Sequence, residues 1–348
     1  MSASSQLIEQ VDALLAGTVH EHRNHWIDVD ASLQAVFSEI ESLVLGGGKR
    51  LRPQFCHWGW VAVGGGAEDP ARIRIGAAIE LLHVFALFHD DVIDDAETRR
   101  GRATTHRRMA DQHRINNMAG EARRFGEGAA ILIGDITYVM SDQLMDGISA
   151  EARRIWHELR MEMNIGQYLD TLGSANRERR IEAAERICRY KSAKYTIERP
   201  LHLGAYAADA ELGAAIAPML SAYGLPLGDA FQMRDDMLGA FGDPLLTGKP
   251  VGGDFVEGKP TPMLARAYAV ATAAQLRVLD LVGTPALSES DVIDIQEVVT
   301  ATGAVSEMES LITALRDEAI QSLDSSMMRG DSYDALVELA DTVTRRTV

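Results

Sequence analysis

The sequence contains few cysteines and no long apolar run, and both absences narrow the class of protein. Only Cys56 and Cys188 occur in 348 residues, which is too few for a disulfide framework. We interpret both as small apolar core residues in a reducing compartment. No stretch approaches the roughly eighteen apolar residues of a membrane span. The first residues, MSASSQLIEQ, lack a basic segment followed by an apolar one. We therefore expect a cytoplasmic protein with neither a secretory signal nor a membrane span.

Basic residues are also scarce. The chain has 34 Lys and Arg against 51 Asp and Glu, a net charge of −17. A chain this acidic is not expected to bind nucleic acid. Taken alone, the charge disfavours a phosphorylated ligand too. That objection disappears if bound metal ions carry the positive charge locally.

Alternating strand patterns bounded by turn residues are missing as well. Apolar residues instead recur at helical spacing along most of the chain. The expected helices cover residues 2–17, 31–45, a segment ending near 63, 71–93, 104–117, 126–148, 151–173, 180–193, 195–208, 211–239, 262–283, 288–302, 304–324 and 332–345. No composition break or repeat divides the chain. We predict an all-α bundle of antiparallel helices forming a single domain over 1–348.

The stretch ELLHVFALFHDDVIDDAETRRGR ends an apolar helix with aspartates. Asp90 and Asp94 are four residues apart, so a helix places them on one face. Two carboxylates this close suit a shared Mg²⁺, which typically binds one or two carboxylates together with substrate phosphates. Arg99 and Arg100 follow and can hold a phosphate. The alternative is an exposed acidic helix end, which is disfavoured because the aspartates close an apolar run.

Three further segments carry charged or hydroxyl groups suited to anions. GGGKRLRP, residues 46–53, combines flexible glycines with cations but lacks the spacing of a Walker A loop; a solvated basic turn remains the alternative. Lys194 and Thr196 are expected near a helix start, where anions bind. His83 lies near the face of Asp90, where a core histidine or a hydrogen-bond donor to an anion are both compatible with the pattern.

A second acidic pair, Asp235 and Asp236, closes the expected helix 211–239. Lys249 and Lys259 follow in a loop rich in Gly, Pro and Asp. Two acidic helix ends, each followed by a basic loop, are a more specific signal than either alone. They predict two carboxylate clusters that face each other across a cavity.

The order GGGKRLRP, ELLHVFALFHDDVIDD, RRG, AFQMRDD and GKPVGGD resembles the trans-isoprenyl diphosphate synthases, the polyprenyl synthetase family. The resemblance covers roughly residues 30–345. It implies an all-α bundle around a deep apolar cavity, usually as a homodimer. It also implies head-to-tail condensation of isopentenyl diphosphate with an allylic diphosphate (dimethylallyl, geranyl or farnesyl), with about three Mg²⁺ ions.

The resemblance also implies roles for individual residues. The metal ligands would be Asp90, Asp91, Asp94, Asp235 and Asp236. The contacts to isopentenyl diphosphate would be Lys49, Arg52, His83 and Arg100. The contacts to the allylic diphosphate would be Arg99, Lys194, Thr196, Gln232, Lys249 and Lys259. Asp90, Asp94, Asp235 and Lys194 would be catalytic.

Two features depart from the family pattern. Tyr195 separates Lys194 from the hydroxyl of Thr196, where the family has a threonine directly after the lysine. Gly239 stands where the second motif, usually DDxxD, has its third aspartate. Its loss could weaken one metal site or mark a regulatory subunit. Asp243 is a nearby substitute, but Gly and Pro flank it. Because the other charged motifs are intact, we expect an active enzyme.

Product length is predicted from the residues before Asp90. In the family, a bulky aromatic at the fifth position upstream limits elongation, and one at the fourth shortens the product further. Here Phe85 is fifth and Ala86 fourth, which resembles geranylgeranyl diphosphate synthases. Phe85 as an ordinary core residue above a deeper floor is the alternative, and farnesyl or longer products then remain open. A terpene cyclase would need no second diphosphate site, so the basic motifs disfavour it.

Overall fold

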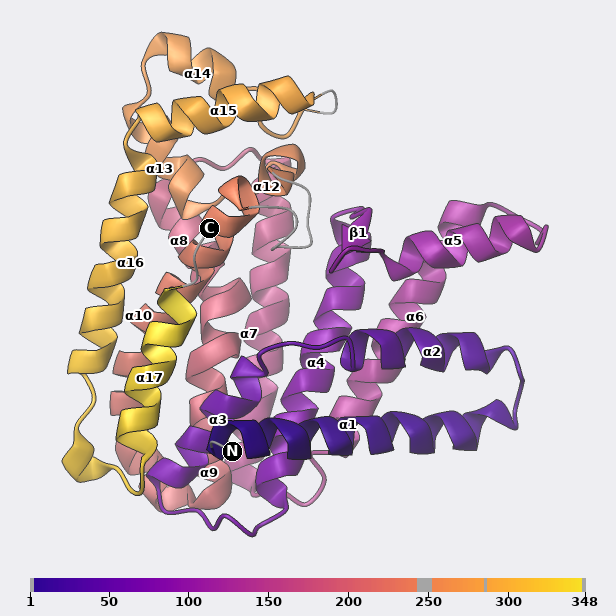
Figure 1. The fold of residues 1–348 in the computed structure, drawn as a ribbon, viewed down its shortest axis with the longest axis vertical. Helices are drawn as coiled ribbons and strands as arrows, with labels where there is room; N and C mark the ends of the chain where they lie inside the picture. Colours follow the sequence, from indigo (N-terminus) through magenta and orange to yellow (C-terminus); the bar gives the residue numbers. More distant parts are fainter. Residues whose placement is uncertain (1–2, 243–251, 285–286, 346–348) are drawn as a thin grey trace.

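The protein is described by a computed structural model that covers residues 3–242, 252–284 and 287–345. The architecture is almost entirely helical, as Figure 1 shows, and the all-α prediction is confirmed. The first half contains α1 (Ala3–Ile27), α2 (Leu33–Val44), α3 (Leu51–Ala62), α4 (Ala71–Ile93), β1 (Thr98–Arg99), β2 (Arg102–Ala103), α5 (Thr105–Ile115), α6 (Ala122–Gln143) and α7 (Ala150–Ala175).

The second half continues the helical pattern. It contains α8 (Ile181–Cys188), the π-helix η1 (Arg189–Glu198), α9 (Arg199–Ala208), α10 (Ala210–Phe241), α12 (Gly253–Glu257), α13 (Pro262–Val270), α14 (Ala273–Leu279), α15 (Glu289–Ala301), α16 (Ala304–Gln321), the 3-10 turn η2 (Ser325–Met327) and α17 (Ser332–Thr344). None of the helices in the described ranges combines the length and apolarity that a membrane span requires.

Several predicted boundaries are wrong. The first helix continues to Ile27 instead of ending at residue 17. The predicted break between 193 and 195 is absent, because no Gly or Pro occurs between residues 181 and 198 to stop the helix, and α8 runs into η1 and then α9. The predicted helix 262–283 is divided, because Thr272 and Gln275 form a capping box that starts α14. The polar loop 96–103 contains the short antiparallel hairpin β1–β2.

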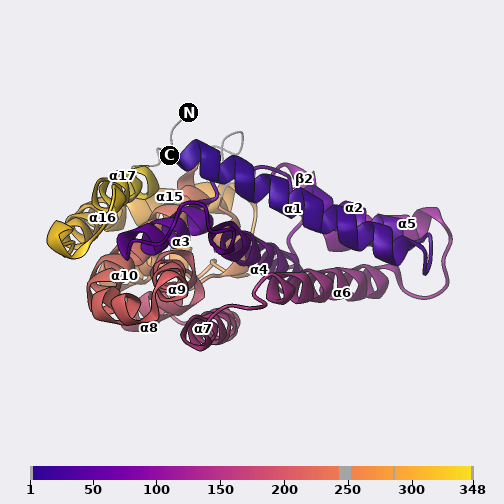
Figure 2. The same cartoon turned by 90° about the horizontal axis from the view of Figure 1, so that it is seen from below.

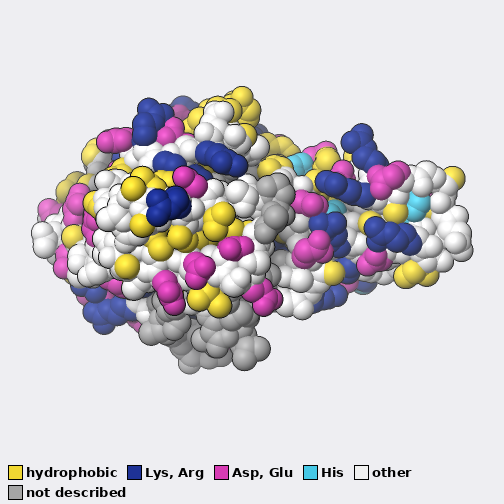
Figure 3. Space-filling model, turned by 90° about the horizontal axis from the view of Figure 1, so that it is seen from above, with side chains coloured by type: hydrophobic (Ala, Val, Ile, Leu, Met, Phe, Trp, Pro, Cys, Tyr) yellow, Lys and Arg dark blue, Asp and Glu magenta, His cyan; other side chains and the backbone are white. Residues whose placement is uncertain are grey.

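The helices form four apolar cores that share a few long elements. Side chains of α1, α2, α4, α5 and α6 make one core, and those of α10, α13, α15 and α16 make another. In Figure 2, α5, α6 and the adjoining ends of α1 and α2 extend away from the rest. Acidic and basic side chains are interspersed on the face seen in Figure 3. α4 packs against both α6 and α3. Its acidic end therefore lies between the projecting helices, which include α5 and α6, and the rest of the molecule.

Close helix crossings bring the functional segments together. A Cβ added at Gly204 of α9 would lie 1.9 Å from the carbonyl oxygen of Cys56 in α3. A Cβ added at Gly166 of α7 would lie 2.3 Å from the backbone nitrogen of Lys191. Only glycine permits these contacts. They hold α3 and α7 tightly against the α8–η1–α9 helix.

Candidate active site

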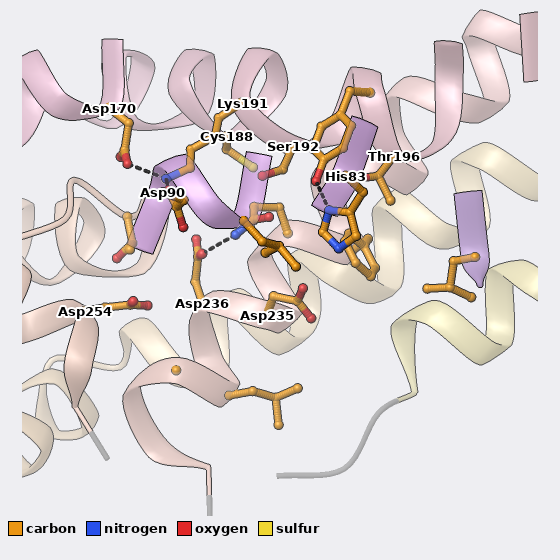
Figure 4. Close-up of a pocket in the computed structure, with 18 of the residues that line it drawn as sticks. His83, Asp90, Asp170, Cys188, Lys191, Ser192, Thr196, Asp235, Asp236 and Asp254 are labelled. Atoms are coloured by element: carbon orange, nitrogen blue, oxygen red, sulfur yellow. Dashed lines mark hydrogen bonds and ion pairs between the residues drawn. The ribbon is translucent and has the colours of Figure 1, made fainter. Parts of the chain in front are cut away.

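A cavity of about 930 Å³ opens between the ends of α4 and α10. Figure 4 shows its carboxylates, with Asp90 and Asp170 on one side and Asp235, Asp236 and Asp254 on the other. The prediction that two acidic helix ends share one cavity therefore agrees with the geometry. A further part of the cavity wall is basic and includes residues of the turn that precedes α3. Leu51, Leu87, Ile187, Phe231 and Leu238 supply apolar surface between the charged groups.

At the end of α4, arginine and lysine side chains compensate the aspartates. Arg99 Nε donates to Asp91 Oδ1 at 2.6 Å, and Arg99 Nη2 lies 3.4 Å from Asp90 Oδ2. Lys259 Nζ donates to Asp94 Oδ2 at 2.7 Å. Burial and the Asp90 carboxylate raise the pKa of Asp94, while the Lys259 ammonium opposes the rise. The hairpin that carries Arg99 and the loop that carries Lys259 thus meet at the aspartates of α4.

Lys191 is a cation of this site that sequence reasoning missed. Its Nζ lies 2.6 Å from Asp170 Oδ2 and 3.4 Å from Asp90 Oδ1. Gln167 Nε2 also donates to Asp90 Oδ1, at 3.0 Å. Gln167 and Asp170 are three residues apart on α7, which places them on one face. The sequence did not indicate that Gln167 and Asp170 belong to the site, because polar and apolar residues are mixed along the whole of α7.

Lys194 does not reach the cavity. It lies inside the π-helix, so the predicted helix start is wrong. Its Nζ donates to Glu162 Oε1 of α7 at 2.5 Å and lies 3.5 Å from Glu198 Oε2. The structure instead turns Lys191, three residues earlier, toward Asp90. Lys249 lies outside the described residues, as does Asp243.

At the end of α10, Asp236 is buried beside a neutral amide and a second carboxylate. Gln232 Nε2 donates to Asp236 Oδ1 at 2.7 Å. Burial, followed by the neighbouring Asp254 carboxylate, raises the pKa of Asp236 well above its usual range. A Cβ added at Gly239 would lie 2.6 Å from Asp254 Oδ2. The carboxylate of Asp254 thus occupies the space beside Gly239 that a side chain there would need.

The basic wall is built from the turn that precedes α3. Lys49, Arg50 and Arg52 all line the cavity, and Arg50 is buried. Arg50 Nη1 donates to Glu80 Oε2 at 3.0 Å, and its φ of 47° is left-handed. Arg100 Nη1 donates to the Gly47 carbonyl at 2.9 Å. Arg50 and Arg100 therefore hold the glycine-rich turn in place through backbone carbonyls at the end of α2 and within the turn. These two arginines line the cavity together with Lys49 and Arg52.

His83 lies at this wall, the side for which it was predicted, and Tyr195 joins it. Thr196 was predicted to contact the allylic diphosphate, but the structure places its hydroxyl beside Arg52 of the basic wall. Arg52 Nη2 donates to Tyr195 Oη at 2.6 Å and to Thr196 Oγ1 at 3.2 Å. Tyr195 Oη lies 3.1 Å from His83 Nδ1. Burial, reinforced by four nearby arginines, lowers the pKa of His83 well below its usual range. The imidazole is therefore neutral at neutral pH.

Comparison with known proteins supports one family. Residues 34–300 of the 348-residue chain match the family described as Polyprenyl synthetase. The chain belongs to the polyprenyl synthetase family. It is 34% identical over 277 residues to the geranylfarnesyl diphosphate synthase of Aeropyrum pernix, covering 77% of this chain and 80% of that one. It is 32% identical over 305 residues to the geranylgeranyl diphosphate synthase of Mycobacterium tuberculosis, covering 86% and 80%.

A solved structure is similar along its whole length. The geranylgeranyl pyrophosphate synthase of Corynebacterium glutamicum, complexed with isoprenyl diphosphate and magnesium, superposes with a TM-score of 0.91. It is 34% identical, and the comparison covers 100% of both chains. This polyprenyl synthetase is therefore a prenyltransferase with the fold of the isoprenyl diphosphate synthases.

The side chains of this polyprenyl synthetase fit magnesium by their chemistry. The cavity collects hard carboxylate oxygens, and the raised pKa values of Asp94 and Asp236 show that added positive charge would stabilise their ionised forms. Among the described residues, no three His, Cys, Asp or Glu side chains converge closely enough to ligate one ion. The hard carboxylate oxygens of the cavity suit Mg²⁺, which usually keeps water and substrate phosphates as ligands beside one or two carboxylates.

A second, smaller cavity lies beside the first. It measures about 120 Å³ and is lined by Phe85 and Ala86, the two residues predicted to set product length. Phe85 stacks on Tyr138, with ring centroids 4.7 Å apart. Both cavities share Leu87, Asp90, Lys191, Ser192 and Tyr195. Phe85 is thus both a packed core residue and part of a cavity wall below Asp90.

Proposed function

We propose that this protein condenses isopentenyl diphosphate head-to-tail with allylic diphosphates, depends on Mg²⁺, and releases mainly geranylgeranyl diphosphate. One observation carries the proposal. A single cavity is lined by two carboxylate clusters and, separately, by the cations Lys49, Arg52 and Arg100. Two diphosphates can thus be bound separately, one through metal ions and one directly by the protein. A terpene cyclase has no use for the second site.

The allylic diphosphate is assigned to the acidic side. Asp90, Asp94 and Asp235 would hold the magnesium ions, with Asp91 and Asp236 beside them. When bound, magnesium would neutralise the diphosphate and make it a better leaving group. Lys191 and Lys259, now paired with aspartates of this cavity, can add two ammonium groups as the carboxylates turn to the metal. Gln232 and Arg99 lie at the same side.

Isopentenyl diphosphate is assigned to the basic side. Lys49, Arg52, Arg100 and His83 hold its diphosphate and orient its double bond. The allylic C–O bond breaks and its electron pair leaves with the diphosphate. The double bond then attacks the allylic cation, and the released diphosphate takes the proton that is lost. The protein contributes mainly position and electrostatics to this sequence.

Product length is assigned to Phe85 and Ala86 below the aspartates. Phe85→Ala removes the ring and enlarges the 120 Å³ cavity, so we expect chains longer than twenty carbons. Ala86→Phe fills the same space and should shift the main product to fifteen carbons. Chromatography of the dephosphorylated products measures both shifts. An unchanged distribution in both variants would exclude Phe85 as the floor and favour a deeper one.

We also propose a homodimer. Two helices carry exposed apolar stripes at heptad-like spacing. On α6 the stripe is Phe125, Leu132 and Val139, and on α7 it is Met161, Ile165, Tyr168 and Leu172. In the view of Figure 2, α6 and α7 lie along the same edge of the molecule. A second copy would cover such a surface. Leu132→Glu with Ile165→Glu should halve the mass measured by light scattering, and an unchanged mass would contradict this interface.

A direct assay tests the enzyme assignment. The purified protein alone is incubated with Mg²⁺, radiolabelled isopentenyl diphosphate and each allylic primer in turn (dimethylallyl, geranyl or farnesyl diphosphate). We expect incorporation and a twenty-carbon main product. No incorporation with any primer would favour the alternative that Gly239 raises, a regulatory subunit. The two free buried cysteines accord with a reducing cytoplasm as the site of the reaction.

A further inference from the structure

Tyr195 lies at a junction that the family roles do not use. It is 8% exposed and lines both cavities. The guanidinium of Arg52 lies over its ring, 4.5 Å from the centroid, and donates to its hydroxyl. Arg52 Nε finds no acceptor in the described part of the chain. Tyr195 and Thr196 therefore supply the hydrogen bonds that orient this guanidinium.

The direction of the hydrogen bonds at Tyr195 follows from the donor at one end. A guanidinium can only donate, so the phenol oxygen accepts from Arg52 at 2.6 Å. The phenol has one proton of its own, and His83 Nδ1 lies 3.1 Å away. If Nδ1 carried a proton, the buried phenol proton would lose this acceptor, and the described residues offer no other. Leaving a buried donor unpaired is costly. Nδ1 is therefore the acceptor, and the imidazole proton is on Nε2.

We propose that Tyr195 is a positioning residue that holds Arg52 and locks His83 in the Nε2–H tautomer, ready to donate to a diphosphate. The inference rests on the proposed function for the identity of that diphosphate, isopentenyl diphosphate. Its structural part, the tautomer, does not. The four arginines that surround His83 disfavour its charged form (Arg50, Arg52, Arg99 and Arg100). His83 thus supplies a neutral donor with a fixed direction, where a freely exchanging tautomer would donate only part of the time.

The resting tautomer is tested first, without substrate. The protein contains ten histidines, so ¹⁵N-histidine labelling and a long-range ¹H–¹⁵N correlation spectrum can resolve them, with His83→Gln assigning the signal. We expect a neutral ring with the proton on Nε2 in the wild type, and a mixture of tautomers in Tyr195→Phe. A proton on Nδ1 in the wild type would overturn the proposal even if the variant failed to fold. So would a tautomer unaffected by Tyr195→Phe.

Steady-state kinetics test the consequence. Tyr195→Phe should raise the KM for isopentenyl diphosphate about tenfold, the loss expected for roughly one hydrogen bond, and leave the KM for the allylic primer within about twofold. Tyr223→Phe is the matched control, because its buried hydroxyl donates to the Leu336 carbonyl at 2.7 Å, away from the cavity. That variant should leave both KM values unchanged.

A double variant separates positioning from general damage. In the Arg52→Ala background, Tyr195→Phe should raise the KM further by less than in the wild type, because one of its two partners is gone. Equal rises for both substrates, or full additivity with Arg52→Ala, would contradict the role. If the protein proves inactive with every primer, the proposed function fails. The tautomer measurement still decides whether Tyr195 holds His83 in the Nε2–H tautomer.

Discussion

The two acidic helix ends of the cavity contain the same residue type but are compensated differently. At the end of α4, arginine and lysine side chains contact the aspartates, as in the pair Arg99–Asp91 at 2.6 Å. At the end of α10, Asp236 accepts from the neutral Gln232 and faces Asp254. No Lys or Arg within the described ranges pairs with Asp236. Asp91 at the end of α4 is therefore paired within the protein, whereas Asp236, like Asp94, has a raised pKa that a bound cation would lower.

The two helix ends should contribute differently to the stability of the metal-free protein, although both are expected to take part in catalysis. Pairing within the protein stabilises the fold of α4 without metal. Burial of Asp236, and then its proximity to the Asp254 carboxylate of α12, disfavours the ionised form of Asp236 without metal and favours cation binding. Substituting an aspartate at either helix end should therefore lower turnover. The effects on stability should be opposite: replacing Asp91 should destabilise the protein, and replacing Asp236 should stabilise it.

The largest expected effect concerns turnover. Asp90→Ala and Asp235→Ala should each lower kcat by orders of magnitude, because each removes a carboxylate that would hold a charge-neutralising ion. The radiolabel incorporation assay measures both. If either variant kept wild-type turnover, that helix end would play no part in the chemistry. Glu289→Ala, an exposed position far along the chain on α15, is the control and should keep full activity.

A stability comparison should give opposite signs. Asp91→Asn leaves Arg99 with a weakened buried partner, so we expect a loss approaching about 3 kcal/mol in the free energy of unfolding. Asp236→Asn removes a repelled carboxylate and should raise the unfolding midpoint in EDTA near neutral pH. Thermal and urea unfolding in EDTA measure both effects. Destabilisation by both variants would end the distinction between the two helix ends.

The pH dependence of the Asp236 effect has a definite sign. A raised pKa in the folded state means that folding favours the protonated carboxyl, so ionisation of Asp236 costs stability as the pH rises above the usual aspartate range. The gain from Asp236→Asn should thus be largest near neutral pH and vanish toward about pH 4. A gain that is constant across this range would point to packing instead of charge.

A smaller effect concerns the missing third aspartate. Gly239→Asp restores the family motif in sequence, but its Cβ would lie 2.6 Å from Asp254 Oδ2. We expect lower stability and no gain in turnover. Gly239→Asp combined with Asp254→Gly relieves the contact and should recover part of the loss. A single variant that gains activity would show that the space beside Gly239 is not limiting.

The sequence located the two ends of the site because their signal is local. Asp90 and Asp235 each close an apolar helical run, and such a run can be recognised without knowledge of the tertiary structure. The contributions of Lys191 and Tyr195 could not be predicted in this way, because the π-helix changes which residues of 189–198 face the cavity. Asp254 was missed as the neighbour of Gly239, since the two are fifteen positions apart in the sequence and only the fold brings them together.

Boundaries failed for similar reasons. The predicted helix start at Lys194 is wrong, because the helix continues through residues 189–198 as η1 and packs against α7. The capping box at Thr272 was legible in the sequence as Thr-x-x-Gln, and it does divide the predicted helix 262–283. Local sequence patterns thus predicted the helices and the charged motifs. Which residues of η1 face the cavity depends on long-range contacts and could not be predicted from such patterns.

Metal dependence of the reaction shows whether the two carboxylate clusters act through bound cations. The purified protein is assayed with isopentenyl diphosphate and farnesyl diphosphate in EDTA, and Mg²⁺ is then added back. We predict no product in EDTA and full turnover after Mg²⁺ exceeds the chelator. Turnover that persists in EDTA, or product formation in Asp90→Ala and Asp235→Ala at the wild-type rate with Mg²⁺, would contradict a cavity in which two carboxylate clusters act through bound cations.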